Sequence, residues 1–182
     1  AGINAICRQV GADVWVVDMG IVSQLDVSHI PGADRLIVAK IGNGTANFTT
    51  GPAMSRQDAE KALLIGFEHA TRLIEDGADL LGTGDMGIGN TTPSAAIGAV
   101  LCGAALDAMV GRGTGVDEAG LVRKRDIVRQ GIEINAPDPQ DGLDVLAKVG
   151  GFEIGGIAGT ILAGAYHRRA VVLDGFISTA GA

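Results

Sequence analysis

Hydrophobic and polar residues are arranged along the chain in two different ways. Short apolar runs rich in valine, isoleucine and leucine are typical of strands buried in a parallel sheet. Longer segments with apolar residues three and four positions apart are typical of helices that turn one face toward a core. On the first pattern, strands are predicted at residues 12–18, 35–40, 78–83 and 170–175.

Helices are predicted between these strands and at both ends of the chain. Ser55, followed three positions later by Asp58, resembles a capping box and predicts a helix that ends at Gly77. Asp141 and Gly150 predict the start and the end of a shorter helix. The other helices are predicted at residues 1–10, 93–102, 121–135, 153–166 and 176–182.

The alternation of strands and helices predicts an α/β fold. We expect a Rossmann-like, mainly parallel sheet with helices on both faces, formed by residues 1–182 as a single domain. Neither end has the composition of a linker, so we expect the chain to be the core of a longer protein. Ligands of such folds bind beyond the carboxyl ends of the strands.

The loop after the third predicted strand is unusually rich in glycine. It reads GTGDMGIGNTTP from Gly82, with Thr92 as the predicted N-cap and Pro93 as the predicted first residue of the next helix. Glycines leave backbone N–H groups accessible and a helix N-terminus attracts anions, so the loop indicates a phosphate site. A tight turn that only reverses the chain would explain the same glycines.

Two further segments resemble this loop. VGRGTG, at residues 110–115, also precedes a predicted helix, and the Arg-Lys-Arg run at residues 123–125 is the densest positive charge in the chain. If one of these basic side chains turns inward, it could bind an anion. The alternative interpretation is that the run forms a solvent-exposed helix face. KVGGFEIGGIAG, at residues 148–159, is expected to bring a third stretch of backbone close. Together they suggest a ligand with a phosphate and a sugar.

Composition narrows the class of protein. A net charge of −7 over 182 residues argues against a nucleic-acid partner. Cys7 and Cys102 lie in apolar helical patterns and are interpreted as buried, reduced thiols. The sequence has no apolar run of membrane-spanning length and no metal-ligand spacing, so neither membrane association nor a metal site is expected.

Acidic residues at strand ends and in loops are the other candidates for chemistry. Asp18 and Asp174 end predicted strands, where they could meet hydroxyls or a developing cation, or cap the following turn. Asp85 lies inside the glycine loop, where a ribose hydroxyl or a cationic ring would explain it. Glu153 is interpreted as an acid at a helix N-terminus, favoured by the dipole. The histidines, His29, His69 and His167, lie near no such loop.

Several motifs taken in order resemble one enzyme family. They are GTANFTTGPAM, GDMGIGNTTPSAA, VGRGTGVDEAGLVRK, DGLDVLAKVGGFEI, GIAGTILAGA and VVLDGF, and together they resemble the nicotinate-nucleotide–dimethylbenzimidazole phosphoribosyltransferases over essentially the whole chain. The resemblance implies transfer of phosphoribosyl from nicotinate mononucleotide to 5,6-dimethylbenzimidazole, with inversion, in cobalamin nucleotide-loop assembly. The products would be α-ribazole 5′-phosphate and nicotinate. It also implies a cytoplasmic homodimer that needs neither metal nor cofactor.

Matched position by position, the resemblance implies a nucleotide site in which Lys124 meets the phosphate. Asp85 stands where the family usually has Glu, which keeps a carboxylate on a shorter side chain. The family's general base is a Glu expected beyond Ala182, so the isolated chain is expected to be inactive. The implied substrate-binding residues are Gly84, Asp85, Met86, Gly87, Ile88, Gly89, Asn90, Thr91, Gly113, Thr114, Lys124 and Gly175.

Three other functions are compatible with parts of the sequence. A paralogue could use another base or a phenol as acceptor, because much of the benzimidazole pocket is expected before the first residue. A dinucleotide-binding oxidoreductase would explain the GxGxxG match at Gly82, Gly84 and Gly87, with Asp107 as the ribose-binding acid. A non-catalytic nucleotide-binding module would explain the small-residue helices as packing surfaces.

Overall fold

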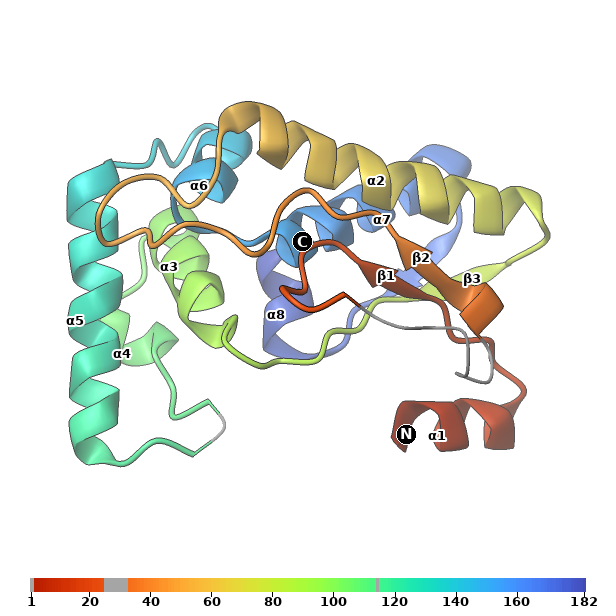
Figure 1. The fold of residues 1–182 in the computed structure, drawn as a ribbon, viewed down its shortest axis with the longest axis horizontal. Helices are drawn as coiled ribbons and strands as arrows, with labels where there is room; N and C mark the ends of the chain where they lie inside the picture. The colour runs from red at the N-terminus through yellow and green to blue at the C-terminus, as the bar shows by residue number, and fades with distance from the viewer. Residues whose placement is uncertain (1, 25–32, 114) are drawn as a thin grey trace.

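The structure is a computed structural model that describes residues 2–24, 33–113 and 115–182. Long helices are joined by short strands and loops, and the N-terminal helix lies apart from the others (Figure 1). The elements in chain order are α1 (Gly2–Val10), β1 (Val16–Asp18), the 3-10 helix η1 (Ala33–Arg35), β2 (Leu36–Val38), α2 (Arg56–Glu75), β3 (Leu80–Gly82), α3 (Thr91–Cys102), α4 (Leu106–Met109), α5 (Glu118–Asn135), α6 (Gly142–Val149), α7 (Phe152–His167), β4 (Ala170–Val172) and α8 (Gly175–Ala180).

The predicted α/β fold with parallel strands is confirmed. Each predicted strand contains an observed one, although every observed strand has only three residues. β1 pairs in parallel with β2, and β3 pairs in parallel with β4. Within the described ranges these pairs are two separate sheets, so the single sheet expected from the sequence is divided here.

Helices lie against one face of the β3–β4 pair. Leu81, the middle residue of β3, is buried in a cluster with Ala70 and Ala163 of the flanking helices α2 and α7. Leu80 and Val172 are exposed at 61% and 54%. The sequence predicted helices on both faces. In the described residues, helices cover only one face of the β3–β4 pair. The middle side chain of β3 points to the core on that face, and its two neighbours in the strand point away.

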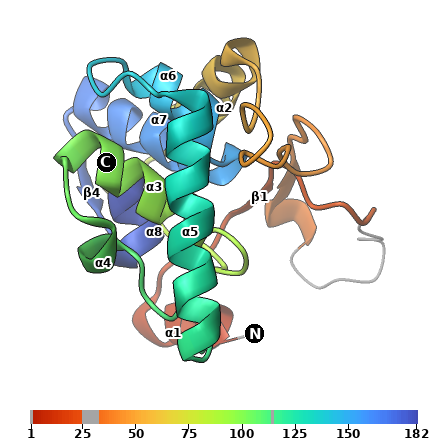
Figure 2. The same ribbon diagram turned by 90° about the vertical axis from the view of Figure 1, so that its left-hand side faces the viewer.

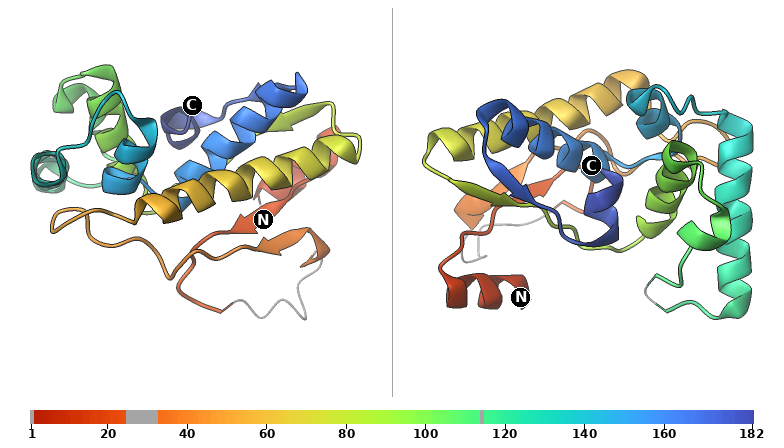
Figure 3. Two further views of the ribbon diagram at one scale, coloured as in Figure 1. Left: turned by 90° about the horizontal axis from the view of Figure 1, so that it is seen from above. Right: turned by 180° about the vertical axis from the view of Figure 1, so that it is seen from behind.

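Helices α2 and α7 pack side by side at very short range (Figure 3). A Cβ placed on Gly66 would overlap the backbone of Gly156, and a Cβ on Gly159 would overlap the backbone of Leu63. The glycines after residue 154 were expected to line a ligand, and this expectation was wrong for Gly156 and Gly159. They lie inside α7 and allow α2 to approach.

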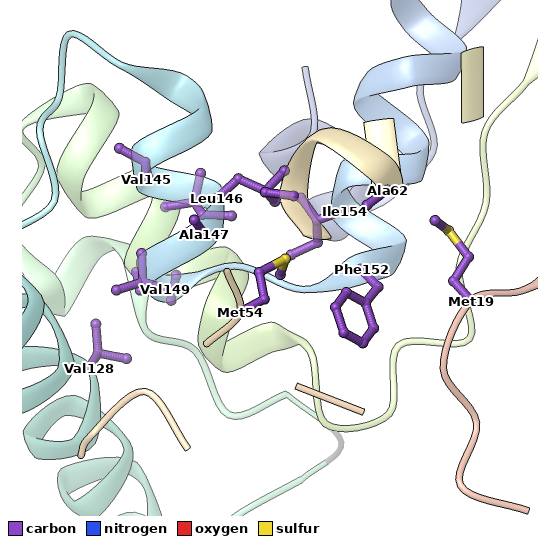
Figure 4. Close-up of a cluster of buried hydrophobic side chains, with 14 of the residues drawn as sticks. Met19, Met54, Ala62, Val128, Val145, Leu146, Ala147, Val149, Phe152 and Ile154 are labelled. Atoms are coloured by element: carbon purple, nitrogen blue, oxygen red, sulfur yellow. The ribbon is translucent and has the colours of Figure 1, made fainter. Parts of the chain in front are cut away.

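The main core lies where α3, α5, α6 and α7 meet. Val145, Val149 and Ile154 are almost completely buried there, and Val128 joins them from α5 (Figure 4). Phe152 covers the end of this cluster nearest β1, where a Cβ on Gly20 would lie 2.9 Å from its ring. Aliphatic residues therefore build most of this core.

Helix α5 lies along one edge of the molecule in Figure 1 and stands in front, beside α3 and α4, in Figure 2. It begins at Glu118, three residues before the predicted start, because Asp117 caps it by accepting from the Gly120 N–H at 2.8 Å. This packing brings the basic run at residues 123–125 toward the N-terminal end of α3.

The caps predicted for two helices are confirmed. The Ser55 hydroxyl accepts from the Asp58 N–H at 3.0 Å at the start of α2. The Asp141 carboxylate accepts from the Leu143 and Asp144 N–H groups, each at 3.1 Å, at the start of α6. Gly77, with φ +105°, follows the end of α2 as expected.

The predicted start of α3 was wrong. The helix begins at Thr91 with Asn90 as its N-cap, so Thr92 is not the cap and Pro93 is the third helical residue. Proline is tolerated there because the first N–H groups of a helix have no partner within the helix. The Asn90 side chain makes no cap hydrogen bond, and its amide is used elsewhere.

The prediction that both cysteines are buried was also wrong. Cys7 is half-buried and Cys102 is exposed at the end of α3, and both are free thiols. In the part of the chain that the structure describes, no helix combines the length and apolar character needed to cross a membrane.

Candidate functional site

The glycine loop between β3 and α3 is organised by Asp85. One carboxylate oxygen, Oδ1, accepts from the Gly87 N–H at 2.6 Å and from the Asn90 side-chain amide at 2.5 Å. Gly87 has φ +72°, a conformation that suits glycine, so this turn depends on it. The Asp85 carboxylate therefore accepts hydrogen bonds from two groups of its own loop.

The outer surface of this loop is apolar. Met86 and Ile88 expose 82% and 76% of their surface, and they flank the turn at Gly87. Exposed apolar side chains beside accessible glycine backbone suit a flat, partly apolar ligand.

Lys124 reaches the same end of α3 from the neighbouring helix α5. Its ammonium Nζ donates to the Thr91 hydroxyl at 2.7 Å and to the Gly111 carbonyl at 3.1 Å. Burial lowers the pKa of Lys124. Both acceptors are neutral, and no carboxylate of the described residues forms an ion pair with this ammonium. Its positive charge is therefore available to an anion at the helix N-terminus.

The other basic side chains of this region are used differently. Arg125 pairs with Asp107 at 2.9 Å, and Arg112 pairs with Glu118 at 2.7 Å. Arg123 is exposed. Lys124 is thus the member of the basic run that contacts the start of α3 and has no carboxylate partner among the described residues.

Gly113 completes the surroundings of this ammonium. It has φ +56°, and a Cβ placed on it would lie 3.0 Å from the Thr91 hydroxyl and 3.3 Å from the Lys124 nitrogen. A side chain at this position would therefore crowd both groups. Thr114, the other candidate in this loop, lies outside the described residues, as does His29.

The loop after β4 lies beside the glycine loop. The Thr83 N–H donates to the Val172 carbonyl at 3.0 Å, which ties the carboxyl ends of β3 and β4 together. Gly175 begins α8, and Ile177 of that helix approaches to 3.8 Å of a Cβ placed on Gly87. Asp174 is the N-cap residue of α8, but its exposed side chain makes no cap hydrogen bond.

Glu153 is a site residue that the sequence interpretation missed. It was interpreted as an acid favoured by the helix dipole, but its half-buried carboxyl folds back over Gly151 and lies near Asp85 and Asn90. Burial, and then the charge of Asp85, raise the pKa of Glu153, while hydrogen bonding to its own N–H and to Asn90 opposes them. The sequence feature that could have identified Glu153 as a site residue is an acidic residue surrounded by glycine and apolar residues, in GGFEIGG.

Asp18 has the structural role that the sequence left open. It is 2% exposed, and its Oδ1 accepts from the Gly20 and Ile21 N–H groups at 3.1 and 2.9 Å. Its other oxygen lies 3.4 Å from Lys40. Asp18 therefore caps the turn after β1.

The structure thus gathers most of the candidate residues at one end of α3. The loop from Gly84 to Thr91 adjoins Gly113, Lys124 and the start of α8 at Gly175. Asp107, which a dinucleotide-binding fold would need at a strand end, lies instead on α4 and pairs with Arg125. This arrangement removes the support for an oxidoreductase.

A family model described as "Phosphoribosyltransferase" matches residues 1–182. The chain belongs to this family. It is 52% identical to the "Nicotinate-nucleotide--dimethylbenzimidazole phosphoribosyltransferase" of Desulforudis audaxviator and 52% identical to that of Roseiflexus sp., each over 100% of this chain and 50% of the relative. The resemblance stated from the motifs is therefore confirmed.

The solved structures agree with the family. The crystal structure of CobT from Thermus thermophilus superimposes with a TM-score of 0.90 at 47% identity, over 100% of this chain and 53% of that chain. A second structure from the same organism, described as a nicotinate-nucleotide–dimethylbenzimidazole phosphoribosyltransferase, gives a TM-score of 0.87 at 44% identity, over 100% of this chain and 52% of that chain. The chain spans about half the length of the curated relatives it matches.

Proposed function

We propose that this chain is the nucleotide-binding core of a longer enzyme that moves phosphoribosyl from nicotinate mononucleotide to 5,6-dimethylbenzimidazole. The products are α-ribazole 5′-phosphate and nicotinate, in assembly of the cobalamin nucleotide loop. Membership of the phosphoribosyltransferase family over residues 1–182 supports the reaction class, and the names of relatives at 52% identity support the two substrates.

The unneutralised ammonium of Lys124 is the observation that carries the proposal. It lies against Thr91, the first residue of α3, and beside the bare backbone of Gly113. A helix N-terminus and a cation together favour a phosphate. The phosphate of nicotinate mononucleotide therefore binds here, contacted by Lys124, Thr91 and the loop that holds Gly113 and Thr114.

The glycine loop holds the rest of the nucleotide. In this proposal the backbone from Gly84 to Gly89 contacts the ribose, together with Gly175 at the start of α8. Met86 and Ile88 are exposed apolar side chains and supply contact area for a flat base. Asp85 and Asn90 keep the loop in its turn.

Positioning provides most of the catalysis that this chain contributes. In the reaction a benzimidazole nitrogen attacks C1′ as the bond from C1′ to nicotinate breaks, and the benzimidazole gives its N–H proton to a general-base carboxylate that this chain does not supply. Holding the phosphate and the ribose fixes C1′ for in-line attack, which lowers the entropic part of the barrier. Neither a metal nor a cofactor takes part in this proposal.

We also propose that the full-length protein is a homodimer in the cytoplasm. The apolar side chains of α1, Ile3, Ile6 and Val10, are exposed at 58%, 63% and 70%, which supports a further packing surface. The two free cysteines fit a reducing compartment. Light scattering coupled to size-exclusion chromatography tests the dimer.

The activity is tested on the full-length protein. Nicotinate mononucleotide and 5,6-dimethylbenzimidazole are incubated with the purified protein, and nicotinate and α-ribazole 5′-phosphate are quantified by chromatography. Equimolar release of both products supports the proposal. Product formation only with another benzimidazole, a purine or a phenol would identify a paralogue, and no nicotinate release with any acceptor contradicts the proposal.

A further inference from the structure

One side of α5 carries a stripe of residues spaced alternately three and four positions apart. They are Leu121, Lys124, Val128, Gly131 and Asn135. Residues at this spacing lie on the same side of a helix. Leu121, Val128 and Gly131 are buried, and the polar members Lys124 and Asn135 are half-buried. The lysine that reaches the start of α3 therefore lies on the side of α5 that packs against the protein.

The other end of this stripe lies against the loop between β2 and α2 (Figure 1). A Cβ placed on Gly131 would overlap the Phe48 ring, so the ring packs directly on the helix backbone. The Asn135 side-chain amide donates to the Phe48 carbonyl at 2.7 Å, and the Gln130 side-chain amide donates to the Thr49 carbonyl at 3.3 Å. Phe48 thus meets α5 through both its ring and its backbone.

The loop holds Phe48 in place by its own hydrogen bonds. The side-chain oxygen of Asn47 accepts from the Thr49 N–H at 3.1 Å and from the Thr49 hydroxyl at 2.8 Å, which closes a turn around the aromatic residue. The Ala53 N–H donates to the Lys148 carbonyl at 3.0 Å, which ties the loop to the end of α6. The loop is therefore a fixed support for the C-terminal half of α5.

The N-terminal half of α5 has weaker supports. Arg125 pairs with Asp107, and Arg112 pairs with Glu118, but the side chains of the two acids are 80% and 70% exposed. Ion pairs at such exposed positions contribute little to stability. The packing of the stripe and its contact with Phe48 therefore set where the helix lies.

We propose that Phe48 and Asn135 are positioning residues that fix α5 along its axis and thereby hold Lys124 against Thr91. Lys124 and Gly131 are about 10 Å apart on the same side of one helix, at 1.5 Å per residue. A helix of constant rise passes a shift at one end on to the other. The motif GTANFTTGPAM, at residues 44–54, gains a role in this way. The inference rests on the proposed function, in which Lys124 binds the phosphate.

Two ligands that differ only in the phosphate test this role in the full-length protein. Phe48→Ala should raise the Kd for nicotinate mononucleotide about tenfold, because Lys124 is no longer held in place. The Kd for nicotinate riboside, which lacks the phosphate, should change by less than about twofold. Phe48→Leu keeps an apolar side chain against Gly131 and should recover most of the affinity. Ile134→Ala, at a position of α5 that is 50% exposed, is the control.

A double variant separates positioning from a general effect. Adding Phe48→Ala to Lys124→Ala should change the Kd for nicotinate mononucleotide by less than about twofold, because the positioned group is already absent. Asn135→Ala is a milder second variant that leaves the ring in place, and it should raise this Kd about threefold. Thermal unfolding checks that each variant folds, and Asn135→Ala decides the test if Phe48→Ala does not.

Three results would overturn the proposal. Equal increases in Kd for the two ligands would show that Phe48→Ala damages the whole site. Additive effects of Phe48→Ala and Lys124→Ala would show that the two residues act independently. Wild-type affinity in both Phe48→Ala and Asn135→Ala would show that the loop does not position α5.

Chemical labelling of lysines keeps the test separate from the proposed function. In the full-length protein without ligand, mass spectrometry measures how fast acetic anhydride modifies Lys124 relative to Lys61, which is exposed on α2. Phe48→Ala should raise this ratio about fivefold, and Ile134→Ala should leave it unchanged. This outcome supports the positioning role even if the wild type binds neither ligand. An unchanged ratio in Phe48→Ala contradicts the role even if the wild type binds nicotinate mononucleotide.

Discussion

The ammonium of Lys124 lies 2.7 Å from the hydroxyl of Thr91, the first residue of α3. A lysine from one helix thus adds its charge to the N-terminus of another, where unpaired N–H groups already favour an anion. The two groups come from positions 33 residues apart, and the packing of α3 against α5 brings them together.

Removing this charge should weaken nucleotide binding selectively. A hydrogen bond to a charged group contributes roughly 1.5–3 kcal/mol, so Lys124→Ala should raise the Kd for nicotinate mononucleotide about 10- to 100-fold. Isothermal titration calorimetry of the full-length protein measures this Kd. Arg123→Ala removes an exposed charge next in sequence and should change the Kd by less than about twofold. An unchanged Kd for Lys124→Ala would refute the phosphate assignment.

A methyl group at Gly113 should disturb the same site. Its φ of +56° disfavours other residues, and the added Cβ would lie 3.0 Å from the Thr91 hydroxyl. Gly113→Ala should therefore lose about 1–2 kcal/mol of stability and bind the nucleotide more weakly. Gly111→Ala is the matched control, because no atom lies within 4 Å of a Cβ placed there. Urea unfolding measures the stability of both variants, and calorimetry measures their Kd for the nucleotide. Equal stability and equal Kd in the two variants would refute the role of Gly113.

The raised pKa of Glu153 makes stability depend on pH in a defined direction. A carboxyl whose pKa is higher in the folded than in the unfolded state binds its proton more tightly when folded. Its favourable contribution is complete below the ordinary value of 4.5 and is lost as pH rises through the raised pKa. Glu153→Gln cannot lose a proton, so its melting temperature should fall less than that of the wild type over this range. Parallel curves would show that the carboxyl titrates normally.

The contact between α2 and α7 should tolerate no side chain at Gly159. A Cβ there would overlap the backbone of Leu63, so the helices would have to separate. Gly159→Ala should cost about 1–3 kcal/mol, measured by urea unfolding. Gly142→Ala, at the first position of α6 where no atom lies within 4 Å, should be neutral or slightly stabilising. Equal stability of the two variants would contradict this close packing.

Local signals in the sequence predicted the helices better than the details of the site. Ser55 and Asp141 were identified as caps because a cap depends on residues within one turn. Thr92 was misassigned because the Asn90 amide is held by Asp85, a partner that the helix pattern does not reveal. Glu153 was missed because its neighbours, Asp85 and Asn90, come from another part of the chain.

The sequence by itself determined the order of the elements other than η1 and α4, the parallel α/β class and the family, since spacing, caps and long motifs are properties of neighbouring residues. Only the tertiary structure decided that Lys124 alone of its basic run turns to the N-terminus of α3, that Gly156 and Gly159 serve helix packing, and that Glu153 faces the glycine loop. These facts depend on how α2, α5 and α7 pack. Packing is set by side-chain shape summed over distant segments, which no local pattern contains.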